Sequence, residues 1–216
     1  MYKYVLFDLD GTIADTSEGV FNATDYMISK QGYRNISIEE KRSILGPPLW
    51  LSFGRFWNIK GNELDRAIEL YREYYAINGL KQMKVYDGTI ELFERLKKAG
   101  CILLVATSKP NHITPQVLDC LDIAKYFTYV ASPNPENEST DKSVLILDAL
   151  KNSNCTDKSK AIMIGDRLYD IDGANKAGVD SIGITYGFGS KQELVEHGAT
   201  FIADSTEEIE RIIKKW

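Results

Sequence analysis

The chain has 216 residues, and its 26 Lys and Arg against 31 Asp and Glu give a formal net charge of −5. This negative balance argues against nucleic acids and anionic membranes as partners, because both bind basic surfaces. Hydrophobic residues at 44% and charged residues at 26% are ordinary for a globular protein, and no segment approaches the ~18 apolar residues of a membrane span.

The first predicted element is a buried strand over residues 4–7, which runs directly into Asp8 and Asp10. Side chains at positions i and i+2 of a strand share one face and lie only ~6–7 Å apart. Two carboxylates at that spacing repel each other and lower stability unless a positive charge lies between them. The end of this strand is therefore a candidate cation site.

Residues 15–83 carry helical patterns and no convincing strand. Apolar residues at helical spacing predict two longer helices, and a shorter one begins at Ser37 between them. The residues that mark the two longer helices are Val20, Thr24, Met27 and Ile28, then Leu64, Ala67, Ile68, Tyr71, Tyr74 and Tyr75. We interpret 15–83 as a helical module inserted after the first strand, with predicted hinges at 14–16 and 84–86.

The rest of the chain alternates between strand and helix patterns. Predicted strands lie at 101–106, 127–131, 161–165, 181–184 and 201–203. Predicted helices lie at 88–100, 112–122, 142–152, 168–178 and 190–197, with a last one from Ser205. This rhythm predicts an α/β fold, with a Rossmann-like parallel sheet core over 1–14 and 84–216 and helices on both sides. The polar segment 132–140 is a predicted surface loop.

Three of these strands end in residues that suit an oxygen-lined cation site. Asp8 and Asp10 follow the first strand, Thr107 follows 101–106, and Asp166 follows 161–165, with Asp170 four residues later. Ligands bind at the carboxyl ends of parallel strands, so these groups are expected to converge. Hard oxygen ligands favour a partly hydrated Mg²⁺ ion. Each motif alone is weak, whereas all three in order make a specific pattern.

Two other metal sites are excluded by spacing. An EF-hand needs its glycine at the sixth loop position, and Gly11 is at the fourth. A zinc site is excluded because His112 and His197 lack ligand spacing around them.

The segments "FDLDGT", "VATSK" and "GDRLYD", together with Lys142, resemble the haloacid dehalogenase-like hydrolase superfamily. The helical insertion is similar to the cap of that family. "GDRLYDIDGANKAG" followed by "YGFGS" resembles its phosphoglycolate phosphatase and nucleotidase-like branch in particular. The resemblance covers essentially the whole chain, and it is specific for the superfamily but not for the substrate.

This resemblance implies a role for each residue at the strand ends. Asp8 would be the nucleophile that forms an aspartyl-phosphate, and Asp10 the general acid and then the general base. Thr107 would hydrogen-bond the phosphoryl oxygens. Asp8, Asp166 and the backbone carbonyl of Asp10 would hold Mg²⁺, with Asp170 assisting.

Lys142, rather than Lys109, is the predicted partner of Asp8 and of the transferred phosphoryl group. Ser139 or Thr140 is the predicted N-cap of the helix that follows, which places Lys142 in its first turn. A cation there opposes the helix dipole, and residues that break a local rule often serve function. The family often has proline after this lysine, where this chain has Ser143.

The substrate is expected to contact residues from the cap and from the strand end at 107. The predicted substrate-binding residues are Thr107, Ser108, Lys109, Gly46, Pro47, Trp50 and Arg55. Gly46 and Pro47 begin a rigid turn before an aromatic stretch. The aromatic residues of this stretch are Trp50, Phe53, Phe56 and Trp57. Their rings either stack on substrate or pack the core of the cap itself, and we favour packing for most of them.

The sequence thus predicts a Mg²⁺-dependent phosphatase that acts on a small phosphomonoester such as phosphoglycolate or a nucleoside monophosphate. Asp10 favours phosphate chemistry, because carbon–halogen cleavage has no leaving oxygen to protonate. A sugar-phosphate mutase, a pyrophosphatase and a non-catalytic phospho-acceptor signalling module remain as alternatives. The expected partner is a small phosphorylated metabolite, and the expected state is a monomer or homodimer.

The cysteines predict a reducing compartment. Cys101, Cys120 and Cys155 are odd in number and far apart, which fits structural burial better than a disulfide framework. The short apolar run at the amino terminus does not predict a signal peptide. We therefore expect a cytoplasmic protein.

Overall fold

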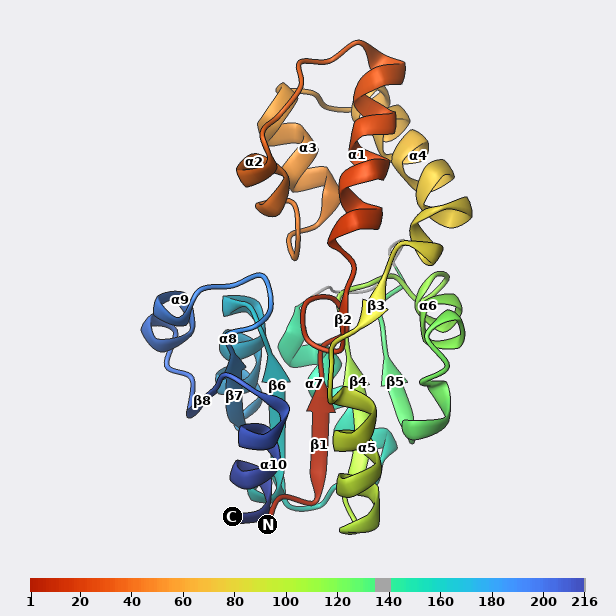
Figure 1. The fold of residues 1–216 in the computed structure, drawn as a ribbon. Helices are drawn as coiled ribbons and strands as arrows, with labels where there is room; N and C mark the ends of the chain where they lie inside the picture. Colours follow the sequence, from red (N-terminus) through yellow and green to blue (C-terminus); the bar gives the residue numbers. More distant parts are fainter. Residues whose placement is uncertain (135–140, 216) are drawn as a thin grey trace. The chain divides into compact units, whose positions relative to one another are not determined.

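A computed structural model describes residues 1–134 and 141–215 of the chain. It contains two compact units, one of Met1–Ala14 with Val85–Trp216 and one of Asp15–Lys84 (Figure 1). Most of the predicted surface loop at 132–140 lies outside the described residues.

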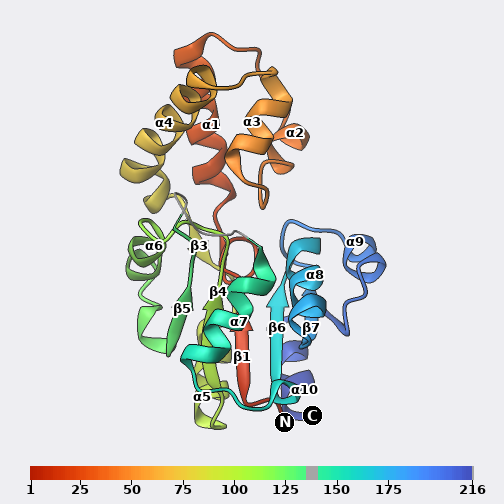
Figure 2. The same cartoon turned by 180° about the vertical axis from the view of Figure 1, so that it is seen from behind.

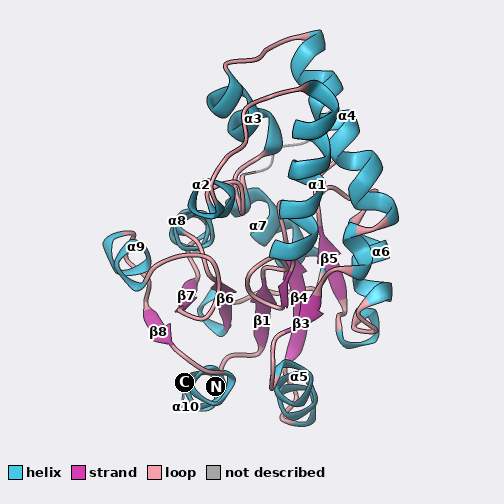
Figure 3. Ribbon diagram, turned by 45° about the horizontal axis from the view of Figure 1, so that its top comes forward, coloured by secondary structure: helices cyan, strands magenta, loops and turns pink. Residues whose placement is uncertain are grey.

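The first unit is built on a six-stranded parallel sheet with the order β5-β4-β1-β6-β7-β8 (Figure 3). The strands are β1 Tyr4–Phe7, β4 Ile102–Ala106, β5 Tyr129–Ala131, β6 Ala161–Gly165, β7 Asp180–Ile184 and β8 Phe201–Ala203. Their continuous apolar runs form buried strands because helices cover both faces of the sheet. The predicted α/β fold with a Rossmann-like parallel sheet is confirmed.

Helices lie on both faces of this sheet. One face is covered by α5 Thr89–Lys98 and α10 Thr206–Lys215, seen in front in Figure 1. The other face is covered by α7 Lys142–Asn152 and α8 Leu168–Ala177, seen in front in Figure 2. The remaining helices are α6 Thr114–Cys120 and α9 Lys191–Glu196, with short 3₁₀ turns η2 Ala124–Tyr126 and η3 Lys158–Lys160. No helix among the described residues is long and apolar enough to cross a membrane.

Neighbouring residues of β1 point to opposite faces and fill two cores. Leu6 packs with Ile146 and Met163 beneath α7 and α8, and all three are fully buried. Phe7 points the other way and meets the rings of Phe93 and Phe127 edge to face, at 5.1 and 6.5 Å. Each such buried side chain contributes about 1.5–3 kcal/mol to stability. Packing on both faces therefore fixes β1 in the middle of the sheet.

The register of β1 decides which side chains meet above the sheet. Phe7 pairs with Val105 of β4 on one side and with Ile164 of β6 on the other. Strands β4 and β6 each extend one residue beyond these partners, to Ala106 and Gly165. Asp8 follows β1 directly, and Thr107 and Asp166 follow β4 and β6 at the same edge of the sheet.

The second unit is helical. Its elements are α1 Ser17–Gln31, α2 Ile38–Arg42, α3 Leu49–Trp57, α4 Asn62–Ile77 and the 3₁₀ turn η1 Gly79–Lys81. The predicted apolar face of α1 is buried at all four marked positions, Val20, Thr24, Met27 and Ile28. Ser37 caps α2 with a capping box, so the predicted start of that helix is confirmed.

Two features of the insertion were not predicted. Helix α3 was missed because the Gly-Pro-Pro before it indicates a turn, although Pro48 becomes its N-cap. The connecting segments β2 Ala14–Asp15 and β3 Lys84–Val85 pair as a two-stranded ribbon. Strands of two residues are too short to show a period-two pattern in a sequence.

The aromatic residues of α3 divide between the interior and the surface of the helical unit. Phe53 is fully buried, and its ring lies 5.5 Å from that of Trp57 and 5.8 Å from that of Tyr71. Phe56 is half-buried and lies 5.8 Å from Trp57. Trp50 is 58% exposed. Most of the stretch thus packs the unit's own core, as we favoured, and Trp50 is the exception.

The cysteines are all free thiols. Cys101 is buried, whereas Cys120 at the end of α6 is exposed. The expectation of structural burial is therefore wrong for Cys120, which is not among the buried residues of α6, and Cys155 is only half-buried.

Candidate active site

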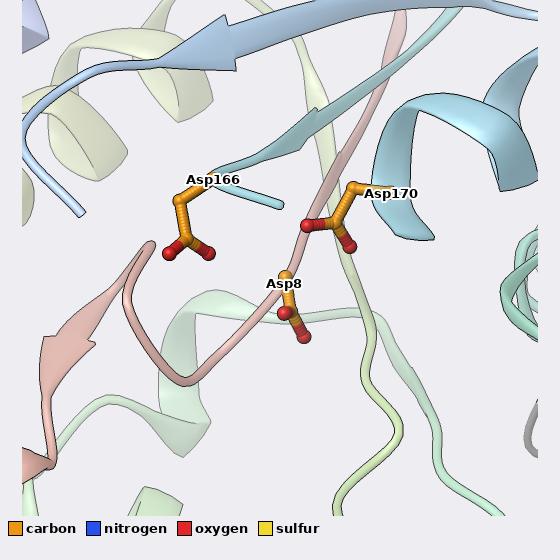
Figure 4. Close-up of side chains that lie close together, drawn as sticks. All are labelled: Asp8, Asp166 and Asp170. Carbon is orange, nitrogen blue, oxygen red and sulfur yellow. The ribbon is translucent and has the colours of Figure 1, made fainter. Parts of the chain in front are cut away.

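Three carboxylates converge at the carboxyl ends of the strands. Asp8 follows β1, Asp166 follows β6, and Asp170 lies in the first turn of α8 (Figure 4). Each offers one oxygen atom, and these atoms lie within 4.8 Å of one another. The parallel strands bring together residues more than 150 positions apart. The three carboxylates thus lie together in the structure, as the sequence predicted.

Lys142 lies between two of them. Its Nζ is 2.9 Å from Asp8 Oδ1 and 2.9 Å from Asp170 Oδ1, and it donates to the backbone carbonyl of Ala106 at 3.1 Å. The lysine thus forms ion pairs with two carboxylates and donates one hydrogen bond to the backbone. Gly173 of α8 makes room for the lysine, because a Cβ there would lie 2.6 Å from Lys142 Cβ. The side chain is almost completely buried.

The start of α7 differs from its prediction. The N-cap is Asp141, whose carboxylate accepts the Ser143 backbone N–H at 2.9 Å. Ser139 and Thr140, the predicted caps, lie outside the described residues. Asp is as good an N-cap as Ser, and its charge also suits the helix dipole. Lys142 is thus the first residue of the helix.

Asp166 is fully buried and accepts one hydrogen bond on each oxygen. Thr12 Oγ1 donates to Oδ1 at 3.2 Å, and the Phe188 backbone N–H donates to Oδ2 at 2.7 Å. Burial, followed by the charges of Asp170 and Asp8, raises the pKa of Asp166 to about 8. The site thus concentrates negative charge in a poorly hydrated place.

The pKa of Asp8 is also raised, but by less than that of Asp166. Burial raises the pKa of Asp8 to about 6, although the nearby Lys142 ammonium acts to lower it. For Lys142, burial lowers the pKa, but the charges of Asp170 and Asp8 outweigh it and raise the pKa. One lysine therefore does not balance the three carboxylates.

The donor set fits a divalent cation. Asp8 Oδ1 and Asp170 Oδ1 are buried and lack a well-directed hydrogen bond among the described residues, although the Lys142 ammonium lies near both. Carboxylate oxygens in such a cluster are the ligands that Mg²⁺ prefers. A bound cation would also relieve the repulsion that raises the two pKa values.

Asp10 has a different partner. Both of its carboxylate oxygens lie 3.0 Å from Lys109 Nζ, and the lysine side chain is only 9% exposed. The carboxylate of Asp10 is not in the group of three that the described residues form. Its predicted contribution to the metal site, through the backbone carbonyl, stays a prediction.

Thr107 is buried beside this ion pair. Its Oγ1 accepts the Lys109 backbone N–H at 3.2 Å, and its own N–H pairs with the Ala131 carbonyl. Ser108 between them is half-buried. The segment after β4 is thereby held in a tight turn at the same edge of the sheet as Asp8.

The comparisons with known proteins agree with this geometry. The model of the family described as "Haloacid dehalogenase-like hydrolase" matches residues 5–184, which include the three carboxylates and both lysines. The chain belongs to the haloacid dehalogenase-like hydrolase family.

Three relatives of this hydrolase span nearly its whole length. A 5'-nucleotidase of Pseudomonas aeruginosa is 33% identical and covers 92% of this chain and 90% of its own. A phosphoglycolate phosphatase of Vibrio parahaemolyticus is 29% identical, covering 98% and 96%. The crystal structure of a predicted phosphatase from Clostridium acetobutylicum has a TM-score of 0.92 and 38% identity, and covers 100% of both chains. These relatives support phosphatase activity for this hydrolase.

The remaining predicted substrate residues belong to the helical unit of the hydrolase. Gly46 is exposed and has a φ of 102°, a conformation that favours glycine. Pro47 follows it, and both Trp50 and Arg55 have exposed side chains on α3. Their role in substrate binding stays a prediction.

Three contacts in the hydrolase were missed by sequence reasoning. The Lys109–Asp10 pair joins residues 99 positions apart, and no spacing rule connects them. The hydrogen bonds of Thr12 and Phe188 to Asp166 were also missed. The closely spaced glycines of "YGFGS" were the available signal, because glycine often marks a close backbone approach.

Proposed function

We propose that this hydrolase is a Mg²⁺-dependent phosphatase that cleaves a small phosphomonoester through an aspartyl-phosphate on Asp8. One observation carries the proposal. Asp8 follows the central strand and lies beside Asp166 and Asp170, with the Lys142 ammonium 2.9 Å from its carboxylate and Asp10 two residues later. Phosphoryl transfer requires such positioning and charge neutralisation more than elaborate covalent chemistry.

In this mechanism Asp8 attacks phosphorus, and the bond between phosphorus and the leaving oxygen breaks. Asp10 donates a proton to that oxygen as the alcohol departs. It then takes a proton from water, which attacks phosphorus and frees Asp8 and inorganic phosphate. Lys142 neutralises charge on Asp8 and on the phosphoryl oxygens, and Thr107 donates a hydrogen bond to one of them.

The proposed metal ligands are Asp8, Asp166 and the backbone carbonyl of Asp10, with Asp170 assisting. When bound, Mg²⁺ supplies positive charge that offsets the anionic oxygens of the phosphoryl group and of the ligands. Full phosphatase activity in excess chelator would refute this part of the proposal. Calcium, which prefers a looser and larger coordination shell, should inhibit.

For the substrate we propose phosphoglycolate or a nucleoside monophosphate. The names of two relatives, a phosphoglycolate phosphatase and a 5'-nucleotidase, support these two classes. We further propose that the helical unit selects between them, with Trp50 and Arg55 as contacts. Both side chains are exposed, and each has chemistry that suits a base or an anionic group.

A panel assay of phosphate release tests this function directly. It would compare phosphoglycolate, the common nucleoside monophosphates, sugar phosphates and pyrophosphate, each with Mg²⁺ and with excess chelator. We expect a clear preference for one of the first two classes. Interconversion of sugar phosphates without phosphate release would instead indicate a mutase.

A further inference from the structure

The loop over residues 185–190 is anchored at both ends and lies against Asp166. At its start, the Thr185 N–H donates to the Ala203 carbonyl of β8 at 3.1 Å. At its end, Ser190 caps α9 by accepting the Glu193 N–H at 3.1 Å. The middle of the loop is therefore held in a defined position.

Asp166 is held by hydrogen bonds from two separate segments. Phe188 in the loop donates its backbone N–H to Oδ2, and Thr12, just after the first strand, donates its hydroxyl to Oδ1. A carboxylate has about four lone-pair sites, so each oxygen retains one for another partner. The two donors fix the plane of the carboxylate, and the remaining lone-pair site on each oxygen is available to a cation.

Glycines allow this close approach. A Cβ on Gly187 would overlap the Gly11 carbonyl oxygen and Asp166 Cβ, and one on Gly189 would overlap the Asp166 carbonyl oxygen. Neither position has a left-handed backbone, so space alone requires glycine there. The loop therefore encloses both the side chain and the backbone of Asp166.

The surroundings of the loop are fixed as well. The Tyr186 ring packs edge to face on Tyr86 at 5.1 Å. In α9, Glu193 accepts the Arg167 Nε–H at 2.9 Å and the Leu168 N–H at 2.8 Å. The residues that follow Asp166 are thus held by the helix to which the loop leads.

We propose that Thr12 and the loop residues Gly187, Phe188 and Gly189 are positioning residues for the divalent cation. They hold the Asp166 carboxylate in its binding orientation, so that the cation need not reorder it. Partners behind a metal ligand usually change metal affinity or activity by about 10–100-fold. This inference rests on the proposed function, because it assumes that Asp166 binds the cation.

The test measures Mg²⁺ binding without substrate, by isothermal titration calorimetry on the full chain. Thr12→Val removes the hydroxyl and keeps the shape, whereas Thr12→Ser keeps the hydroxyl. We expect Thr12→Val to weaken Mg²⁺ binding by about 10-fold and Thr12→Ser to stay within about twofold of wild type. Gly187→Ala should weaken binding by about 10–100-fold.

Gly183→Ala is the matched control. A Cβ there would crowd Leu194 at 3.0 Å rather than Asp166. It should lower the melting temperature and leave Mg²⁺ affinity within about twofold of wild type. If Thr12 and Gly187 had only a structural role, their variants would likewise show a lower melting temperature and an unchanged Mg²⁺ affinity.

The outcomes separate this inference from the proposed function. Wild-type protein that binds no Mg²⁺ at millimolar concentration would contradict the proposed function itself. Wild-type protein that binds Mg²⁺, together with a folded Thr12→Val variant that binds it equally well, would overturn the positioning role alone. Thr12→Val decides the matter even where Gly187→Ala fails to fold.

Discussion

The carboxyl edge of the sheet and the helical unit are held together by different forces. At the sheet edge, three carboxylates lie close together, Lys142 pairs with Asp8 and Asp170, and burial with mutual repulsion raises the pKa of Asp8 and Asp166. In the helical unit, rings such as Phe53 and Tyr71 pack on one another, with their centroids 5.8 Å apart. Residues that lower stability where they are placed are usually kept for function. We therefore expect substitutions at the sheet edge to affect turnover and substitutions in the helical core to affect folding.

The largest effect is expected at the two aspartates after β1. Asp8→Asn should reduce turnover below detection, because the amide cannot form the phosphoenzyme. Asp10→Asn should lower kcat by about 10²–10⁴-fold, and less for substrates with good leaving groups, which need less protonation. Steady-state kinetics on an alkyl and an aryl phosphate measure both. Near-native turnover by a folded Asp8→Asn variant would show that the nucleophile is wrongly assigned.

The two lysines of the site give the next largest contrast. Lys142→Ala removes the cation between Asp8 and Asp170, and kcat should fall by about 10²–10³-fold. Lys109→Ala frees Asp10 from its ion pair, and we expect a smaller loss. Both variants should be checked by circular dichroism. If the kcat values rank in the opposite order with both proteins folded, Lys109 is the more important lysine.

The sequence predicted the sheet edge far better than the helical unit. The strand ends were predictable because the carboxyl ends of parallel strands lie at one edge of a sheet, so Asp8, Thr107 and Asp166 were expected there together. Helix α3 was not predictable from local rules, because Gly46 and two prolines indicated a turn. The partner of Asp10 was not predictable either, since an ion pair between distant residues leaves no periodic pattern.

The helical unit offers a matched pair of aromatic substitutions. Phe53→Ala should lower the free energy of unfolding by about 3–5 kcal/mol, because the ring is completely buried. Trp50→Ala, at an exposed position of the same helix, should change it by less than about 0.5 kcal/mol. Urea unfolding followed by fluorescence and circular dichroism measures both.

Kinetics on the same pair then tests substrate selection. Trp50→Ala should shift KM and substrate preference more than it affects a small artificial ester. Equal losses on every substrate would mean that Trp50 has no part in selection.

The smallest effect is a pH dependence of stability in the presence of chelator. Asp8 and Asp166 have folded-state pKa values of about 6 and about 8, above the ordinary aspartate value of 3.8. Between pH values of about 4 and 8, the folded protein therefore binds more protons than the unfolded one. Its free energy of unfolding falls as the pH rises through this range. Melting temperatures across this range should decline, and Asp166→Asn should flatten the decline. A melting temperature that rises with pH would contradict the charge imbalance at the sheet edge.

The most direct test of the mechanism is to locate the phosphoryl group on the protein. The Asp10→Asn variant should form the phosphoenzyme from an acyl or aryl phosphate and hydrolyse it slowly, because its general base is lost. After acid quench and proteolysis, mass spectrometry should find one phosphate per chain, on Asp8. Phosphate on another residue, or an unmodified Asp8 while the leaving group is still released, would contradict the account.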